Sequence, residues 1–172
     1  PASAGMSYVL RNYVNDTHSW VWADFKDNLK SNFKQGLVVY LIDTVVICMF
    51  AVSIFFYSVQ MGGSLASLAL RAIVVAVFFI FALMHLYIYP VMVTFKLSIK
   101  NIYRNALLLA MAKLPWNILT AAVMGGLVYG GLYLVVSSGL GIFAIILLYF
   151  SLVSFTSIFM TNNVIRKFML EP

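Results

Sequence analysis

The sequence predicts an all-α polytopic membrane protein, a bundle of transmembrane helices with amphipathic helices at its cytoplasmic surface. Of the 172 residues, 63% are hydrophobic and only 9% are charged, and the mean hydropathy is +0.99. So little polar surface cannot cover a soluble domain of this size. The lengths of the apolar stretches and the placement of the basic residues then predict the number of spans and their orientation.

Four stretches are long and apolar enough to be transmembrane helices. A helix needs about 20 residues to cross roughly 30 Å of hydrocarbon, where the backbone has no other hydrogen-bond partners. The predicted spans are residues 36–60, 68–94, 116–136 and 140–162. The rest of this single integral membrane domain, residues 1–172, is an interfacial region at 1–35, a cytoplasmic interfacial helix at 95–115 and a tail at 163–172.

The Lys and Arg residues are distributed asymmetrically about these spans. Ten of the eleven precede the first span, separate the second from the third, or follow the fourth: Arg11, Lys26, Lys30, Lys34, Lys96, Lys100, Arg104, Lys113, Arg166 and Lys167. The other, Arg71, lies at the far end of the second span. Because translocated loops are poor in Lys and Arg, the basic segments and both ends of this sequence are predicted to be cytoplasmic.

The net charge of +6 indicates contact with the anionic headgroups of the lipid bilayer. Nucleic-acid binding is not expected, because the charges are spread over three segments and form no single patch.

Residues 17–35 have the spacing of an amphipathic helix. Its basic stripe consists of Lys26, Lys30 and Lys34, and its apolar stripe of Trp22, Phe25, Leu29 and Phe33. Such a helix is predicted to lie on the cytoplasmic headgroups or against another protein, and to turn at Gly36 into the first span. Residues 2–14 form a second, shorter helix candidate, and a turn at residues 15–16 separates the two.

A second basic stripe lies between the second and third spans. Lys96, Lys100 and Arg104 fall at i, i+4 and i+8, which places them on one face of a helix. Pro90 and Pro115 are predicted to interrupt the helical structure on either side of this helix. Two interpretations stay open for the stripe: a solvated face that reaches lipid phosphates, or a docking surface for a protein partner.

Asp43 is the acidic residue inside a predicted span, and a carboxylate there needs a partner or water. It lies nine residues from Lys34, or about 13 Å along a helix. His85 lies eleven residues from Lys96, or about 16 Å, and so at a similar depth. The two are predicted to pair if the first two spans pack together, either as a proton relay or polar substrate contact, or simply as a link between helices.

The third and fourth spans carry ordered small and polar residues. Ala122, Gly126 and Gly130 recur every four residues and predict a face for close helix packing, within the chain or with another copy. Ser151, Ser154, Ser157 and Thr161 lie along one side of the fourth span. Hydroxyls in this arrangement either line a polar crevice or, more commonly, bond to backbone carbonyls. Cys48 is expected to be a small buried hydrophobe.

No enzyme signature is present in the sequence. It has no paired acids within a span, no His/Cys cluster with metal-ligand spacing, and no glycine loop followed by Lys and Ser or Thr. The protein is therefore expected to be non-enzymatic, with no catalytic residue, cofactor or metal.

Four segments of the chain resemble the bacterial YesL-like membrane proteins, a family of unknown biochemical activity. They are PASAGMSYVLRN at 1–12, WADFKDNLKSNFKQG at 22–36, YPVMVTFKLSIKNIYRNALLLAMAKLP at 89–115 and NNVIRKF at 162–168. The resemblance implies one more hydrophobic segment before Pro1 and a location in the bacterial cytoplasmic membrane. Because the genes of the family often accompany carbohydrate ABC importers, it also implies an accessory subunit that contacts the permease subunits.

Two other functions remain open from the residues themselves. One is a small proton-linked carrier that uses Asp43 and His85. The other is a membrane scaffold or homo-oligomer assembled through Ala122, Gly126 and Gly130.

Overall fold

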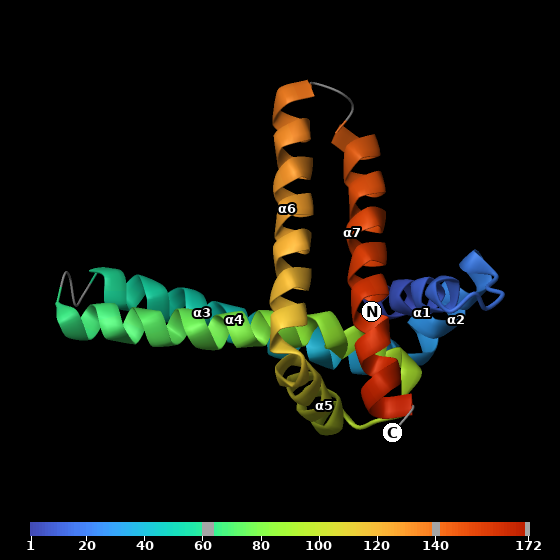
Figure 1. The fold of residues 1–172 in the computed structure, drawn as a ribbon, viewed down its shortest axis with the longest axis horizontal. Coiled ribbons are helices and arrows are strands. Elements are labelled where there is room, and N and C mark those ends of the chain that lie inside the picture. The colour runs from blue at the N-terminus through green and yellow to red at the C-terminus, as the bar shows by residue number, and fades with distance from the viewer. Residues whose placement is uncertain (60–63, 139–141, 171–172) are drawn as a thin grey trace.

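The computed structural model describes residues 1–59, 64–138 and 142–170, and these are helical almost throughout, with no strand among them (Figure 1). The helices are α1 (Ala2–Val14), α2 (Val21–Ser31), α3 (Phe33–Val59), α4 (Leu65–Thr94), α5 (Ile99–Ala112), α6 (Leu114–Ser138) and α7 (Ile142–Ile165). A π-helical turn, η1 (Arg166–Leu170), follows α7 directly. The predicted all-α class is confirmed.

Among the described residues, three helices are long and apolar enough to cross a membrane: Phe33–Val59, Leu65–Thr94 and Leu114–Ser137. They correspond to the first three predicted spans and indicate a membrane protein. The fourth predicted span, residues 140–162, falls mostly on α7. Its first two residues lie outside the described residues, as do the side chains up to residue 148. The count of four spans therefore stays a prediction.

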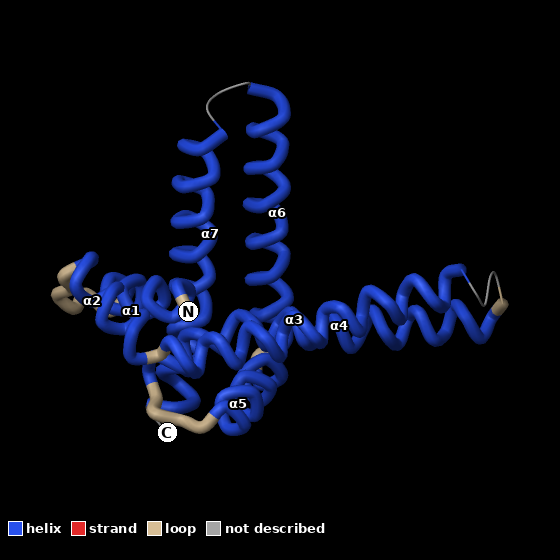
Figure 2. Tube along the Cα trace, turned by 180° about the vertical axis from the view of Figure 1, so that it is seen from behind, coloured by secondary structure: helices blue, strands red, loops and turns tan. Residues whose placement is uncertain are grey.

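The long helices form two antiparallel hairpins, α3–α4 and α6–α7, which project from a common base in different directions (Figures 1 and 2). The hairpins meet around the C-terminal half of α4 and diverge beyond it. The predicted bundle of transmembrane helices is thus two separate hairpins that share only the base. Apolar helix faces gain little by packing on each other in lipid, so the arrangement depends on the small and polar residues at the base.

The base is built around α1, which contacts α2, α4 and α7. Its buried face carries mainly small side chains, Ala4, Gly5 and Ser7, followed by Val9 and Asn12. Gly5 is needed for this packing, because a Cβ atom there would lie 2.7 Å from the backbone oxygen of Phe25 on α2. The bounds predicted for α1 are correct, but the helix is part of the core of the base and not only an interfacial element.

The break before the first long helix occurs earlier than predicted. Helix α2 ends at Ser31, α3 begins at Phe33, and Gly36 lies within α3. Gly36 does not form a turn but allows Pro1 to approach α3 closely, since a Cβ atom at Gly36 would lie 3.1 Å from the Cα of Pro1. As a result Lys34 belongs to α3, and the predicted stripe of three lysines is divided between two helices.

The second basic stripe is also divided. Helix α4 continues through Pro90, which makes no break, and ends at Thr94, the predicted end of the second span. Helix α5 begins only at Ile99, after the extended N-cap residue Ser98. Lys96 thus lies in the connection between two helices, and only Lys100 and Arg104 are on α5. Serine favours the N-cap position over the helix interior, because its short polar side chain can hydrogen-bond to nearby backbone groups.

Cys48 is exposed, contrary to the expectation that it is buried. Helix α3 buries only the face that carries Gly36, Val39 and Asp43, and Cys48 lies beyond that face. On a helix that crosses a membrane, such a position faces lipid, where a small apolar side chain is equally well accommodated.

Candidate functional site

Asp43 is buried at the contact of three helices. The buried residues of α3 are Gly36, Val39 and Asp43, whose spacing of three and four places them on one helix face. This face packs on α4. Only 5% of Asp43 is exposed, so its carboxylate needs partners from the neighbouring helices.

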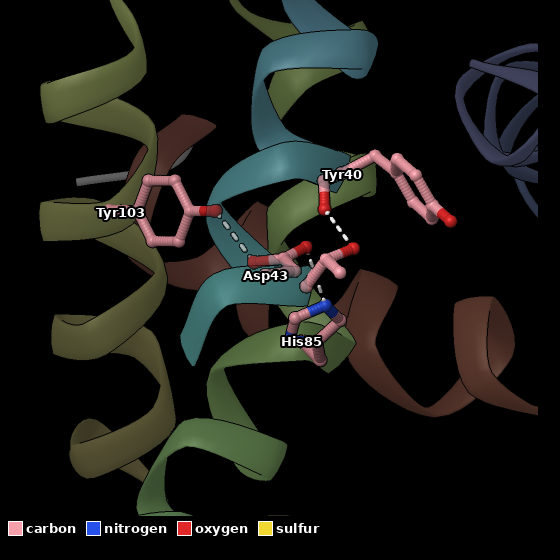
Figure 3. A network of polar contacts seen from close by, with 5 residues as sticks. Tyr40, Asp43, His85 and Tyr103 are labelled. Atoms are coloured by element: carbon pink, nitrogen blue, oxygen red, sulfur yellow. Dashed lines mark hydrogen bonds and ion pairs between the residues drawn. The ribbon is translucent and has the colours of Figure 1, made fainter. Parts of the chain in front are cut away.

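Both oxygens of the Asp43 carboxylate have such a partner (Figure 3). The Nε2 atom of His85 on α4 lies 2.9 Å from Oδ2. The hydroxyl of Tyr103 on α5 donates to Oδ1 at 2.7 Å. With the carboxylate as the acceptor, Nε2 of His85 carries a proton. The structure thus brings together the two residues that the sequence paired and adds a third, so that one carboxylate joins α3, α4 and α5.

Tyr103 is held in its protonated form. Burial, together with the hydrogen bond to Asp43 and its charge, raises the pKa of Tyr103 above its ordinary value of 10.0. The hydroxyl therefore remains a hydrogen-bond donor to the carboxylate over the physiological pH range. Tyr103 was not predicted as a site residue, because it lies outside the predicted spans and its depth depends on how α5 folds back.

The imidazole of His85 also borders a cavity. The cavity has a volume of about 380 Å³ and is lined mostly by apolar atoms from α1, α4, α6 and α7. Its polar lining residues include Ser154 and Ser157 of the predicted hydroxyl row. Thr161, in contrast, is buried and donates to the backbone oxygen of Ser157 at 2.8 Å. Ser154 and Ser157 therefore border a mostly apolar cavity, whereas Thr161 follows the more common interpretation, a bond to a backbone carbonyl.

The six predicted basic contact residues are all exposed at the base: Lys26, Lys30, Lys34, Lys96, Lys100 and Arg104. Helix α2 has no buried residue at all, and Trp22 is 75% exposed. The base thus presents cationic and aromatic side chains together. This combination suits a membrane interface or a protein surface at the level of the headgroups.

The predicted small-residue face of α6 is divided between two environments. Ala122 and Gly126 are exposed, and a Cβ atom on Gly126 would meet nothing within 4 Å. The close contact with α7 is instead made at Gly131, where a Cβ atom would lie 2.6 Å from the ring of Tyr149. Gly130 touches only the hydroxyl of that tyrosine, at 3.4 Å. Within the chain the close contact is thus made at Gly131, and packing of Ala122 and Gly126 on another copy stays a prediction.

Asn117 is a buried polar residue that the sequence did not single out. It is 0% exposed, and its side-chain amide donates to the backbone oxygens of Leu109 and Ala110 at 3.0 and 2.8 Å. Its Oδ1 accepts a hydrogen bond from Tyr87 of α4. The residue therefore satisfies carbonyls at the C-terminal end of α5 and joins α4, α5 and α6.

Residues 1–54 match the model of a protein family described as "Protein of unknown function, DUF624", to which the YesL-like proteins belong. No curated protein and no solved structure matches the chain. The matched part covers α1, α2 and most of α3, and it includes Asp43. The N-terminal part of this membrane protein is thus similar to the DUF624 family.

Proposed function

We propose that the protein is a non-enzymatic accessory subunit of a bacterial carbohydrate ABC importer, embedded in the cytoplasmic membrane. The observation that supports it best is the combination of long apolar hairpins with an exposed basic base. In each of the three candidate spans only 11% of the most apolar part is buried within the chain. Such surfaces are available to lipid and to the helices of a larger membrane complex.

The orientation in this proposal follows from the positions of the basic residues. The segments that carry ten of them lie around the base, whereas Arg71 lies towards the far end of α4. With the base on the cytoplasmic side, this distribution follows the positive-inside rule. The association with carbohydrate import rests on the resemblance to YesL-like proteins, and the permease subunits are the proposed partners.

Co-purification with a tagged permease from native membranes tests this proposal. We expect the complex to form with the wild type and to be lost when Lys26 and Lys30 on the exposed helix α2 are both replaced by Glu. The matched control is Arg71→Glu, which reverses a charge away from the base and is expected to keep the complex. A protein that leaves native membranes alone, without permease subunits, would contradict the proposal.

A second candidate function is a proton-linked carrier, favoured by the contact of 2.9 Å between Asp43 and His85 at the border of a cavity. In this case Asp43→Asn abolishes uptake by reconstituted vesicles while the protein stays folded. The reason is that a side-chain amide, unlike a carboxylate, cannot take up and release a proton. Uptake by this variant with an unchanged pH dependence would exclude the carrier.

A third candidate is a homo-oligomeric scaffold, favoured by the open space at Gly126. Gly126→Leu is expected to dissociate the oligomer without destabilising the monomer, as measured by light scattering and thermal unfolding in detergent. Gly131→Leu is the matched variant: it collides with Tyr149 and is expected to lower the free energy of unfolding by about 2 kcal/mol. An oligomer that persists after Gly126→Leu would rule out assembly through this face.

A further inference from the structure

Arg11 differs from the exposed basic residues of the base because it is partly buried between helices. Its guanidinium donates to the backbone oxygen of Val93 at 3.3 Å and to the hydroxyl of Thr94 at 3.0 Å, both on α4. It also donates to Oδ1 of Asn12 at 3.2 Å and lies 4.8 Å from the centre of the Tyr8 ring. All these partners are neutral groups.

No carboxylate pairs with Arg11 within the part of the chain that the structure describes. Burial lowers the pKa of Arg11 below its ordinary value, and the opposing influence comes from Tyr8, not from an acidic residue. An arginine nevertheless stays charged in a protein. Since a partly desolvated cation without a counter-charge is unfavourable, this position favours the binding of an anion.

A cavity of about 260 Å³ lies beside Arg11. Its walls come from α1, the turn after it, and the C-terminal ends of α4 and α7, all of which meet in the base. The lining residues other than Arg11 are Asn12, Asn15, Thr17, Thr94, Asn162 and Ile165. Because one water takes up about 30 Å³, the space is sufficient for a group of several atoms, and five of these residues offer amide or hydroxyl groups.

The polar lining is held in place by its own hydrogen bonds. The amide of Asn162, which is 5% exposed, donates to Oδ1 of Asn15 at 2.8 Å. The hydroxyl of Thr17 donates to the backbone oxygen of Asn12 at 3.0 Å. Asp16, which lies between Asn15 and Thr17 in the sequence, has a φ of 52°, and this left-handed conformation forms a tight turn. A preorganised set of donors loses little entropy when it binds a ligand.

We propose that this cavity binds a phosphate group, with Arg11 as the cationic anchor and the side-chain amides of Asn12 and Asn15 as additional donors, since the hydroxyls of Thr17 and Thr94 already donate to backbone oxygens. The planar fork of a guanidinium matches the oxygens of a phosphate, and a tetrahedral oxyanion can accept from several of the surrounding groups at once. The phosphate belongs either to a phospholipid headgroup or to a soluble phosphate compound. This site does not depend on any role in carbohydrate import.

Binding to the purified full chain in detergent tests the site, with inorganic phosphate in one arm and phosphatidylglycerol in the other. We expect at least one of the two to bind the wild type, and Arg11→Ala to weaken its binding about tenfold or more. Arg71→Ala is the control, since it removes the same charge from a position of α4 away from the base and is expected to leave the affinity unchanged. The arm that responds identifies the source of the phosphate.

A second variant keeps Arg11 and fills the cavity. Thr17→Leu changes an exposed lining residue, so it is expected to abolish binding while the unfolding temperature stays close to that of the wild type. This variant decides the question if Arg11→Ala fails to fold. The proposal is overturned if neither ligand binds, if Thr17→Leu binds as tightly as the wild type, or if Arg11→Ala and Arg71→Ala weaken binding equally.

Discussion

Replacing Asp43 by Leu is expected to lower the free energy of unfolding by about 3 kcal/mol. The leucine fills the space but leaves Nε2 of His85 and the hydroxyl of Tyr103 without the acceptor that both now use. It also removes a carboxylate that joins α3, α4 and α5. The loss is measured by denaturant or thermal unfolding of the purified protein in detergent, followed by circular dichroism.

Two further substitutions make this experiment specific. Asp43→Asn keeps an oxygen acceptor and is expected to cost only about 1 kcal/mol. Thr44→Val removes the hydroxyl of the residue next to Asp43. This hydroxyl donates to the backbone oxygen of Tyr40 in the same helix, and its loss is expected to change the free energy of unfolding little. If Asp43→Leu is as stable as Thr44→Val, the carboxylate does not hold the three helices together.

The sequence predicted the helices themselves because their signal is local. Apolar stretches of about 20 residues identify α3, α4 and α6, and the bounds of α1 follow from its flanking turn. The proximity of Asp43 and His85 was also predictable, because counting residues from the basic ends places both at a similar depth in adjacent spans. No tertiary information was needed beyond the assumption that neighbouring spans pack together.

The contacts that decide the tertiary arrangement were not predictable from periodicity. In lipid, helix faces are apolar all round, so the pattern of the sequence does not show which side meets another helix. Gly131 and Gly126 have similar sequence surroundings, yet only Gly131 faces Tyr149. Tyr103 reaches Asp43 only because α5 folds back against α4, and the exact starts of α3 and α5 separated Lys34 and Lys96 from their predicted stripes.

Buried polar residues such as Asn117 therefore carry much of the specificity of this fold, and this leads to the second large effect. Asn117→Leu is expected to lower the free energy of unfolding by about 3 to 5 kcal/mol. It leaves the buried hydroxyl of Tyr87 and the carbonyls of Leu109 and Ala110 without their present partner. Unfolding in detergent measures the loss, and hydrogen exchange is expected to show it first at the C-terminal end of α5.

A double-mutant cycle with Tyr87→Phe separates the two sets of bonds. In the Asn117→Leu background, Tyr87→Phe removes a hydroxyl that has already lost its acceptor, so the double variant is expected to be about 1 kcal/mol more stable than the sum of the single effects predicts. Asn101→Ala, at an exposed position of α5, is the control and is expected to stay within about 0.5 kcal/mol of the wild type. Equal stabilities for Asn117→Leu and Asn101→Ala would show that α5 is held to α4 and α6 by apolar packing alone, and that the buried amide is dispensable.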